Sequence, residues 1–174
     1  MRPNKNDYAP YYDRYVSLVK GDNIHKILAE QSMATQEVLN SFPGTVGNYS
    51  YEDGKWTVKE VIGHLIDTER VMAYRAMCIA RGEKKPLPGF EQDDYVKFGN
   101  FNKRELSDLI YEFRLLRESN LLLAKGFDEE CLQRRGVASN NEINVLALLY
   151  IIAGHENHHM RILHERYKQS YTSM

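Results

Sequence analysis

The chain has 174 residues, of which 43% are hydrophobic and 27% are charged, and its net charge is −1 at pH 7. These values are typical of a globular protein with one buried core, and they exclude a polybasic surface for nucleic acid. No apolar run is long enough to span a membrane, and Cys78 and Cys131 lack the spacing of a disulfide framework or a metal site. We therefore expect one cytoplasmic domain over residues 1–174.

Four segments carry the apolar period of 3.6 residues that is typical of amphipathic helices, and no segment sustains the period of two that predicts strands. The first segment runs from Asp22 to Phe42 and ends at Pro43 and Gly44, which interrupt a helix. We therefore expect an all-α protein without a sheet.

The second segment begins at Thr57, which can cap a helix by accepting a hydrogen bond from the backbone of Glu60. The Glu60 side chain can bond back to Thr57, which completes a capping box. The segment runs to Arg81, where Gly82 can supply a left-handed stop. We therefore interpret Glu60 as a capping residue rather than as a catalytic acid or base.

The third segment begins at Asn102, with Glu105 at the capping-box position, and it ends at residues 125–126. Asn144 can cap the fourth segment. The connection 82–100 is much longer than a hairpin between antiparallel helices requires, and it has no clear period. We therefore expect a four-helix bundle with a long crossover between the second and third helices.

The fourth segment, residues 144–167, contains four histidines. Residues advance by about 100° around a helix, which puts His155 and His159 in the middle of the apolar stripe, one turn apart. His158 falls at the edge of that stripe, and His164 falls on the opposite face. We therefore expect two histidines to point into the core.

His64 lies inside the apolar stripe of the second segment, next to Gly63, which permits close approach of a neighbour. Two imidazoles on an apolar face are costly to desolvate unless both find partners, and a metal ion would satisfy both. From the H-x-x-x-H spacing of His155 and His159 alone, a metal site and a hydrogen-bonded core pair are about equally good interpretations. If the second and fourth helices pack face to face, His64 would join the pair, and three imidazoles suit zinc, nickel or ferrous iron.

At these residues the chain resembles the DinB-like family, which includes metal-dependent hydrolases of the YfiT type. The resemblance is carried by YEDGKWTVKEVIGHLIDTERVMAYRAMCIARGE, PLPGFEQDDYV and IIAGHENHHMRILHERY, in this order. It implies a four-helix bundle with a crossover, often dimeric, in which His64, His155 and His159 are the ligands of a divalent metal ion. It also implies activities such as hydrolysis or the transfer of a thiol cofactor.

Two classes of function follow from these residues. The leading hypothesis is a metal-dependent enzyme that activates water or a thiol, either a hydrolase or a thiol S-transferase, and that acts on a small molecule such as a low-molecular-weight thiol. The competing hypothesis is a non-catalytic, stress-linked binding or dimerisation module with a structural or vacant histidine site. No catalytic residue is assigned, and we expect a homodimer.

Several polar residues near the histidines allow two interpretations each. Asp67 could orient a histidine or act as a general base, or it could pair with a lysine or arginine on the surface. Arg75 points inward and could hold an anionic group of a substrate, or it could anchor the long connection through Glu91, Asp93 or Asp94.

Glu156 is interpreted as a polar contact between helices rather than as a base. His158 could bind a proton or a dimer partner, although solvation at the edge of the stripe is the simpler interpretation. Four tyrosines near the N-terminus are interpreted as an arm that packs across the bundle, with a substrate lid as the alternative: Tyr8, Tyr11, Tyr12 and Tyr15.

Overall fold

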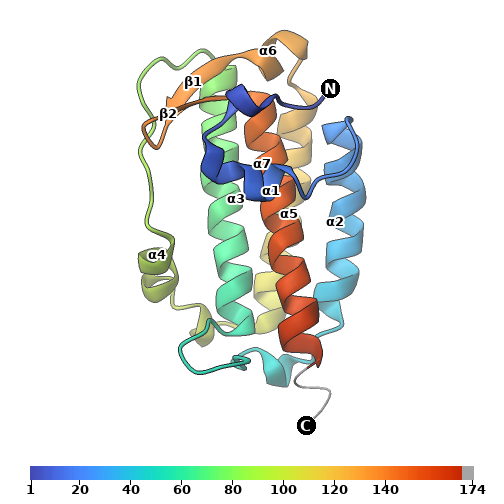
Figure 1. Cartoon of the computed structure of the whole chain (residues 1–174). Coiled ribbons are helices and arrows are strands. Elements are labelled where there is room, and N and C mark those ends of the chain that lie inside the picture. The colour runs from blue at the N-terminus through green and yellow to red at the C-terminus, as the bar shows by residue number, and fades with distance from the viewer. Residues whose placement is uncertain (170–174) are drawn as a thin grey trace.

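The computed structural model describes residues 1–169 and contains four long helices packed side by side (Figure 1). They are α2 (Ile24–Asn40), α3 (Val58–Ala80), α5 (Leu106–Lys125) and α7 (Val145–Ile162). Helix α3 packs against α5 and α7, and α2 packs against the same two helices from the other side. The predicted four-helix bundle is confirmed, and no described helix has the length and hydropathy that crossing a membrane requires.

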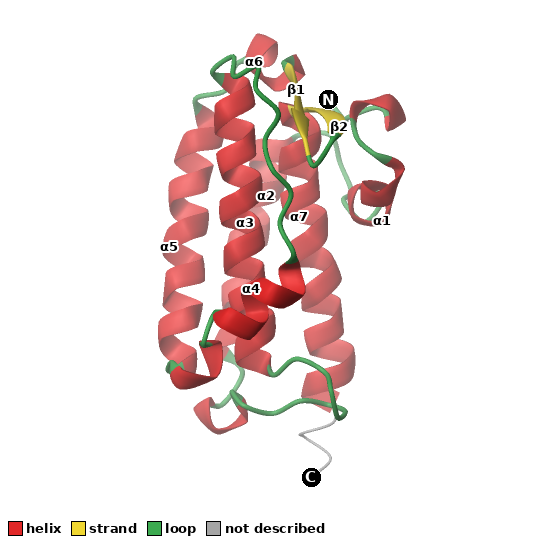
Figure 2. Cartoon of the chain, turned by 90° about the vertical axis from the view of Figure 1, so that its left-hand side faces the viewer, coloured by secondary structure: helices red, strands yellow, loops and turns green. Residues whose placement is uncertain are grey.

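The crossover between α3 and α5 runs the length of the bundle (Figure 2). After Gly82, which has the left-handed φ of +86° expected of a helix stop, the chain descends outside α3 and forms the short helix α4 (Gln92–Phe98). Because the crossover returns the chain to the end where α3 began, α3 and α5 run parallel. The crossover ends at Phe101, whose ring lies 2.4 Å from the position that a Cβ atom of Gly63 would occupy. A glycine is therefore required beside His64.

The prediction of no sheet is wrong, because a short hairpin leads into α7. Strands β1 (Arg135–Ala138) and β2 (Asn141–Asn144) pair antiparallel, and their turn residues Ser139 and Asn140 have φ of 50° and 62°. Two consecutive positive φ values match the twist of a two-residue hairpin turn. Four residues per strand are too few for a period of two to emerge from the sequence. The described residues also form the short α-helices α1 (Asp13–Val16) and α6 (Glu129–Gln133).

The capping box at the start of α3 is confirmed. The Glu60 backbone nitrogen donates to Thr57 Oγ1 over 3.1 Å, and the Thr57 nitrogen donates to Glu60 Oε2 over 2.8 Å. Asn144 caps α7 by accepting from the Ala147 backbone nitrogen over 2.8 Å, as predicted. These helices therefore begin where their local sequence indicates.

The predicted cap of the third helix at Asn102 is wrong. Helix α5 begins at Leu106, after Glu105 at the N-cap position. The Asn102 amide instead donates to Glu60 Oε1 over 2.9 Å, and Asn102 Oδ1 accepts from Thr57 Oγ1 over 2.6 Å. Asn102 therefore joins the end of the crossover to the capping box of α3, a contact between segments that local sequence does not reveal.

A polar layer divides the core of the bundle. One apolar cluster surrounds Ile79 and Leu146, and a second surrounds Val58 and Leu163 near the opposite end. Each long helix contributes buried polar side chains between these clusters: Thr35 from α2; His64, Thr68 and Glu69 from α3; Arg117 from α5; and His155, Glu156 and His159 from α7. The candidate site lies in this layer.

Candidate metal centre

The three predicted histidines meet between α3 and α7. Their side chains each offer one ring nitrogen, and these nitrogens all lie within 4.8 Å of one another. The Nε2 atoms of His64 and His155 are 2.9 Å apart. The ring centroid of His159 lies 4.8 Å from that of His64 and 4.5 Å from that of His155. The convergence expected from the helical positions is therefore present, while metal binding by these residues stays a prediction.

Burial keeps these imidazoles neutral. The residues His64, His155 and His159 are only 3%, 5% and 8% exposed. Desolvation, with a smaller contribution from neighbouring histidines, lowers the pKa of His64 to about 4 and that of His159 to about 3. The same causes lower the pKa of His155 well below its ordinary value of 6.5. At neutral pH each ring therefore retains a nitrogen lone pair for a ligand.

The donor set fits a divalent ion of the first transition series. Imidazole nitrogens bind zinc at about 2.0–2.1 Å, so two of them on one tetrahedral ion are about 3.3 Å apart. The nitrogens of His64 and His155, which are 2.9 Å apart, need to separate only slightly to reach that distance. Among residues 1–169, no further histidine, cysteine or carboxylate joins the group, which leaves coordination positions for other ligands.

Neighbouring side chains hold the histidine rings in place. The Trp56 ring centroid lies 4.8 Å from that of His64, and Thr68 Oγ1 lies 3.4 Å from His64 Nδ1. The ring of Tyr15 packs edge-on to His155, with centroids 5.3 Å apart. Contacts of this kind restrict ring orientation and select which nitrogen is protonated. Trp56 was not assigned to the histidine group from the sequence.

Two cavities reach the histidine group from outside. The first has a volume of about 350 Å³ and touches His155; its wall comes from the N-terminal segment, α3 and the crossover, including Tyr11, Tyr12, Tyr15, Thr68, Arg75 and Phe90. The second has a volume of about 260 Å³ and touches His159; Tyr51, Lys55, Trp56 and Tyr167 line it. We call these the His155 cavity and the His159 cavity. The usual lower limit for small-molecule sites is about 300 Å³, so the His155 cavity is just above it and the His159 cavity just below it.

The N-terminal arm forms part of the site. Tyr8 and Tyr15 are buried, which confirms that the arm packs on the bundle. A Cβ atom at Gly154 would lie 2.1 Å from the Tyr15 carbonyl oxygen, so the backbone of α1 rests directly on α7 one residue before His155. The wall of the His155 cavity therefore depends on this glycine.

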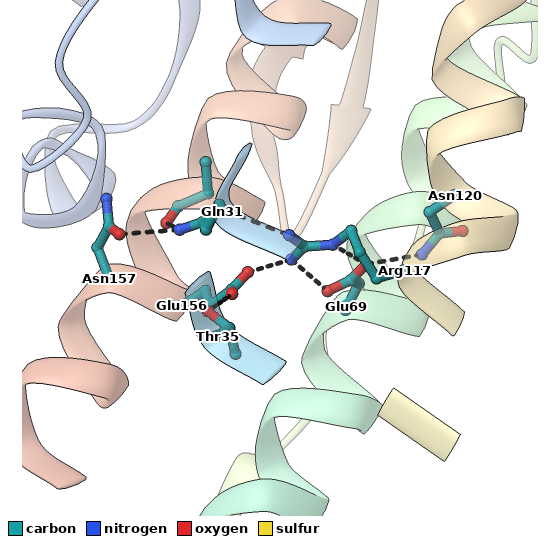
Figure 3. Close-up of polar contacts among 8 residues, drawn as sticks. Gln31, Thr35, Glu69, Arg117, Asn120, Glu156 and Asn157 are labelled. Carbon is teal, nitrogen blue, oxygen red and sulfur yellow. Dashed lines mark hydrogen bonds and ion pairs between the residues drawn. The ribbon is translucent and has the colours of Figure 1, made fainter. Parts of the chain in front are cut away.

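A buried charge network surrounds Arg117 (Figure 3). Arg117 donates through Nε to Glu69 Oε1 over 2.8 Å and through a terminal nitrogen to Glu69 Oε2 over 2.7 Å. It also forms an ion pair with Glu156, which accepts a hydrogen bond from Thr35. The interpretation of Glu156 as a contact between helices is confirmed. Burial raises the pKa of Glu156, because a carboxylate is costly to desolvate.

Sequence reasoning missed Glu69 and Arg117. The sequence holds a signal for Arg117, because it follows the apolar Phe113 by four positions and so lies on the same face of α5. The network draws on all four long helices, because Gln31 of α2 also accepts from Arg117 over 3.4 Å. It therefore fixes how the helices are rotated around the site.

Asp67 does not join the histidines. Its carboxylate pairs with Arg70 over 3.8 Å, and Arg70 also pairs with Glu112 of α5 over 2.6 Å. The surface-pair interpretation of Asp67 is therefore confirmed. His158 is half-buried with its ring edge-on to Tyr15, at a centroid distance of 5.6 Å, while His164 is exposed as expected.

Arg75 contacts the crossover, but through other partners than expected. It donates to the Pro88 carbonyl over 2.6 Å and to Ser139 Oγ over 2.9 Å. The predicted ion pairs with Glu91, Asp93 or Asp94 are wrong, since none of these carboxylates lies within 4.0 Å of the guanidinium. Backbone and hydroxyl oxygens therefore hold Arg75 in the wall of the His155 cavity.

Comparison with known proteins gives matches over most of the chain. Residues 27–163 match the family model of the DinB superfamily. A protein of Oceanobacillus iheyensis, whose name suggests a metal-dependent hydrolase, is 24% identical over 143 residues, which are 80% of this chain and 82% of that protein. YfiT from Bacillus subtilis, described as a probable metal-dependent hydrolase with an unusual four-helix bundle topology, has a TM-score of 0.72 at 15% identity, covering 97% of this chain and 93% of YfiT. The similarity to YfiT shows that this chain has the same fold.

Proposed function

The chain belongs to the DinB superfamily, and we propose that it is a metal-dependent enzyme that binds one divalent ion through His64, His155 and His159. The observation that carries the proposal is the convergence of three buried imidazoles, all kept neutral, beside cavities that admit a small molecule. A divalent cation bound there would lower the pKa of a coordinated water or thiol and so supply a nucleophile near neutral pH.

The residues of the chain bind and orient the reactants in this proposal. His64 is held by Trp56 and Thr68, so its ring cannot turn away from the group. The His155 cavity would admit the substrate, and its tyrosines would exclude bulk water from one side. Zinc, nickel and ferrous iron all suit three imidazole ligands.

An open site supports catalysis over a purely structural metal site. A structural zinc ion usually has four protein ligands, whereas a catalytic one keeps a position for water or substrate. Within residues 1–169 the group contains three candidate ligands and no fourth. This observation favours the enzyme hypothesis over the binding-module hypothesis.

We favour hydrolysis over thiol transfer. The Oceanobacillus relative is named after a metal-dependent hydrolase and YfiT is described as a probable one, which supports water as the nucleophile. A low-molecular-weight thiol is the alternative nucleophile, and a cytoplasmic homodimer is the assembly that we propose.

The first experiment measures metal content. Purified protein, stripped of metal and then reloaded with zinc, nickel or ferrous iron, should retain one ion per chain. His64→Ala, His155→Ala and His159→Ala should each lose most of that ion while keeping the helical circular dichroism spectrum. His164→Ala is the matched control, because His164 is exposed on the opposite face of the same helical run, and it should retain the ion. Full metal content in His64→Ala would contradict the assignment of ligands.

The second experiment separates the two reactions. The metal-loaded protein is assayed for hydrolysis of ester and amide substrates, and for reaction with electrophiles in the presence and absence of low-molecular-weight thiols. Turnover without thiol that disappears in His155→Ala supports hydrolysis. Turnover that requires thiol supports an S-transferase, and turnover that persists in all three histidine variants would contradict a metal-dependent enzyme.

A further inference from the structure

Two arginines are almost completely buried within the described chain, and their surroundings differ. Arg117 is 1% exposed and pairs with the carboxylates of Glu69 and Glu156. Arg75 is 2% exposed, and among residues 1–169 no carboxylate oxygen lies within 4.0 Å of its guanidinium nitrogens. A buried charge without a counter-charge is costly, because the protein interior screens and solvates it poorly. Arg75 therefore lacks the anion that Arg117 has.

The guanidinium of Arg75 also has unused donors. It carries five N–H groups. One terminal nitrogen donates to the Pro88 carbonyl and to Ser139 Oγ, and the other contacts Met72 Sδ over 3.6 Å. Among the described residues, no hydrogen bond partner is found for Nε. This arrangement fixes the position of the guanidinium and leaves donors for a further acceptor.

The His155 cavity connects Arg75 with the histidine group. Both Arg75 and His155 line it. Arg75 lies eleven residues after His64 on α3, which corresponds to about 16 Å along the helix axis. Side chains on a helix lean toward its N-terminus, so the Arg75 side chain leans toward His64. A molecule that contacts both groups must therefore have several bonds between its two ends.

Charged residues other than Arg75 also line the His155 cavity. Glu91 and Asp93 of the crossover line the same cavity, and both are exposed. They are screened by water and lie at its rim, whereas Arg75 is buried in its wall. Arg75 also borders a shallower hollow of about 280 Å³ that is lined by Tyr74 and Tyr95 and does not reach the histidines.

We propose that Arg75 binds an anionic group, a carboxylate or a phosphate, at the far end of a small substrate whose reactive end lies at the histidine group. The inference rests on the proposed function and names the substrate class of that site. The guanidinium fork matches the paired oxygens of both anions, and burial strengthens the interaction relative to water. The phenol-lined wall of the cavity packs against the chain between the two ends.

Binding of defined probes tests this inference without any enzyme assay. Metal-free protein is titrated calorimetrically with adipate, with its uncharged diamide, and with inorganic phosphate. Adipate or phosphate should bind and the diamide should not. Arg75→Gln should weaken binding by roughly 10- to 100-fold, because a hydrogen bond to a charged group is lost. Arg81→Gln is the matched control, since it removes the same charge from the exposed end of α3, and it should leave binding unchanged.

Four further measurements keep the test decisive if Arg75→Gln is unstable. In the wild-type protein, the ¹⁵Nε signal of Arg75 should shift on addition of adipate. Glu91→Gln with Asp93→Asn should tighten anion binding, because rim repulsion is removed. Tyr74→Ala, in the neighbouring hollow, should not affect it. In zinc-loaded protein, affinity for dicarboxylates from malonate to suberate should pass through a maximum at the length that connects Arg75 with the histidines.

The inference is overturned if neither anion binds the wild-type protein, if binding is equal in Arg75→Gln, or if the Arg75 signal does not move at saturation. Its failure is distinguishable from failure of the proposed function. Absence of metal binding would remove the proposed function while anion binding to the metal-free protein still reported on Arg75. Metal binding without any role for Arg75 would remove only the inference.

Discussion

Replacing Arg117 by methionine should strongly destabilise the protein. The change removes the cation and leaves Glu69 and Glu156, which are 4% and 1% exposed, facing each other without a counter-charge. Breaking a buried ion pair by removing one partner costs about 3–5 kcal/mol. Arg117 holds two carboxylates, so we expect a loss in this range, equivalent to roughly 6–20 °C in Tm for a chain of this size.

The assay is urea denaturation followed by circular dichroism, which compares the free energy of unfolding at a constant m-value. Arg70→Met is the control, because Arg70 pairs with Glu112 on the partly exposed surface, and it should cost at most about 1 kcal/mol. A triple variant that combines Arg117→Met with Glu69→Gln and Glu156→Gln should recover much of the loss, since no unpaired charge is left buried. The reasoning is refuted if Arg117→Met costs no more than Arg70→Met, or if the triple variant is no more stable than the single one.

Three other predictions follow. Gly154→Ala should displace α1 from α7, because the new Cβ would lie 2.1 Å from the Tyr15 carbonyl oxygen. We expect the free energy of unfolding, measured by urea denaturation, to fall by about 1–3 kcal/mol, and amide exchange around Tyr15 to become faster. Unchanged exchange would contradict this prediction. Asn102→Ala should cost about 1 kcal/mol although Asn102 caps no helix, because its bonds to the α3 capping box are lost; an unchanged urea midpoint would argue against that contact. The metal-free protein should lose stability as pH falls from about 6.5 toward 4, because the pKa of His64 is lowered to about 4 in the folded state, so the unfolded state binds protons first. That loss should approach about 1.4 kcal/mol per pH unit for each such histidine, and a pH-independent free energy of unfolding over this range would refute it.

The sequence alone was sufficient to predict four long helices and the inward histidines. The rotation of about 100° per residue determines which residues share a face of a helix, and this depends only on local backbone geometry. His155 and His159 therefore fell on the core face of α7, and His64 on that of α3, before any packing was known. Local capping signals likewise located the starts of α3 and α7, because the partners in a cap lie within a few residues of each other.

Only the tertiary structure decided which groups meet across helices. Asn102 has the local pattern of a cap, yet it bonds to the start of α3, because the crossover brings the two segments together. Arg75 and Arg117 both lie on the inward faces of their helices, but packing places carboxylates beside Arg117 and a cavity beside Arg75. The physical reason is that these partners depend on the rotation and register of one helix against another. Packing of the whole core sets those quantities, and no short stretch of sequence contains them.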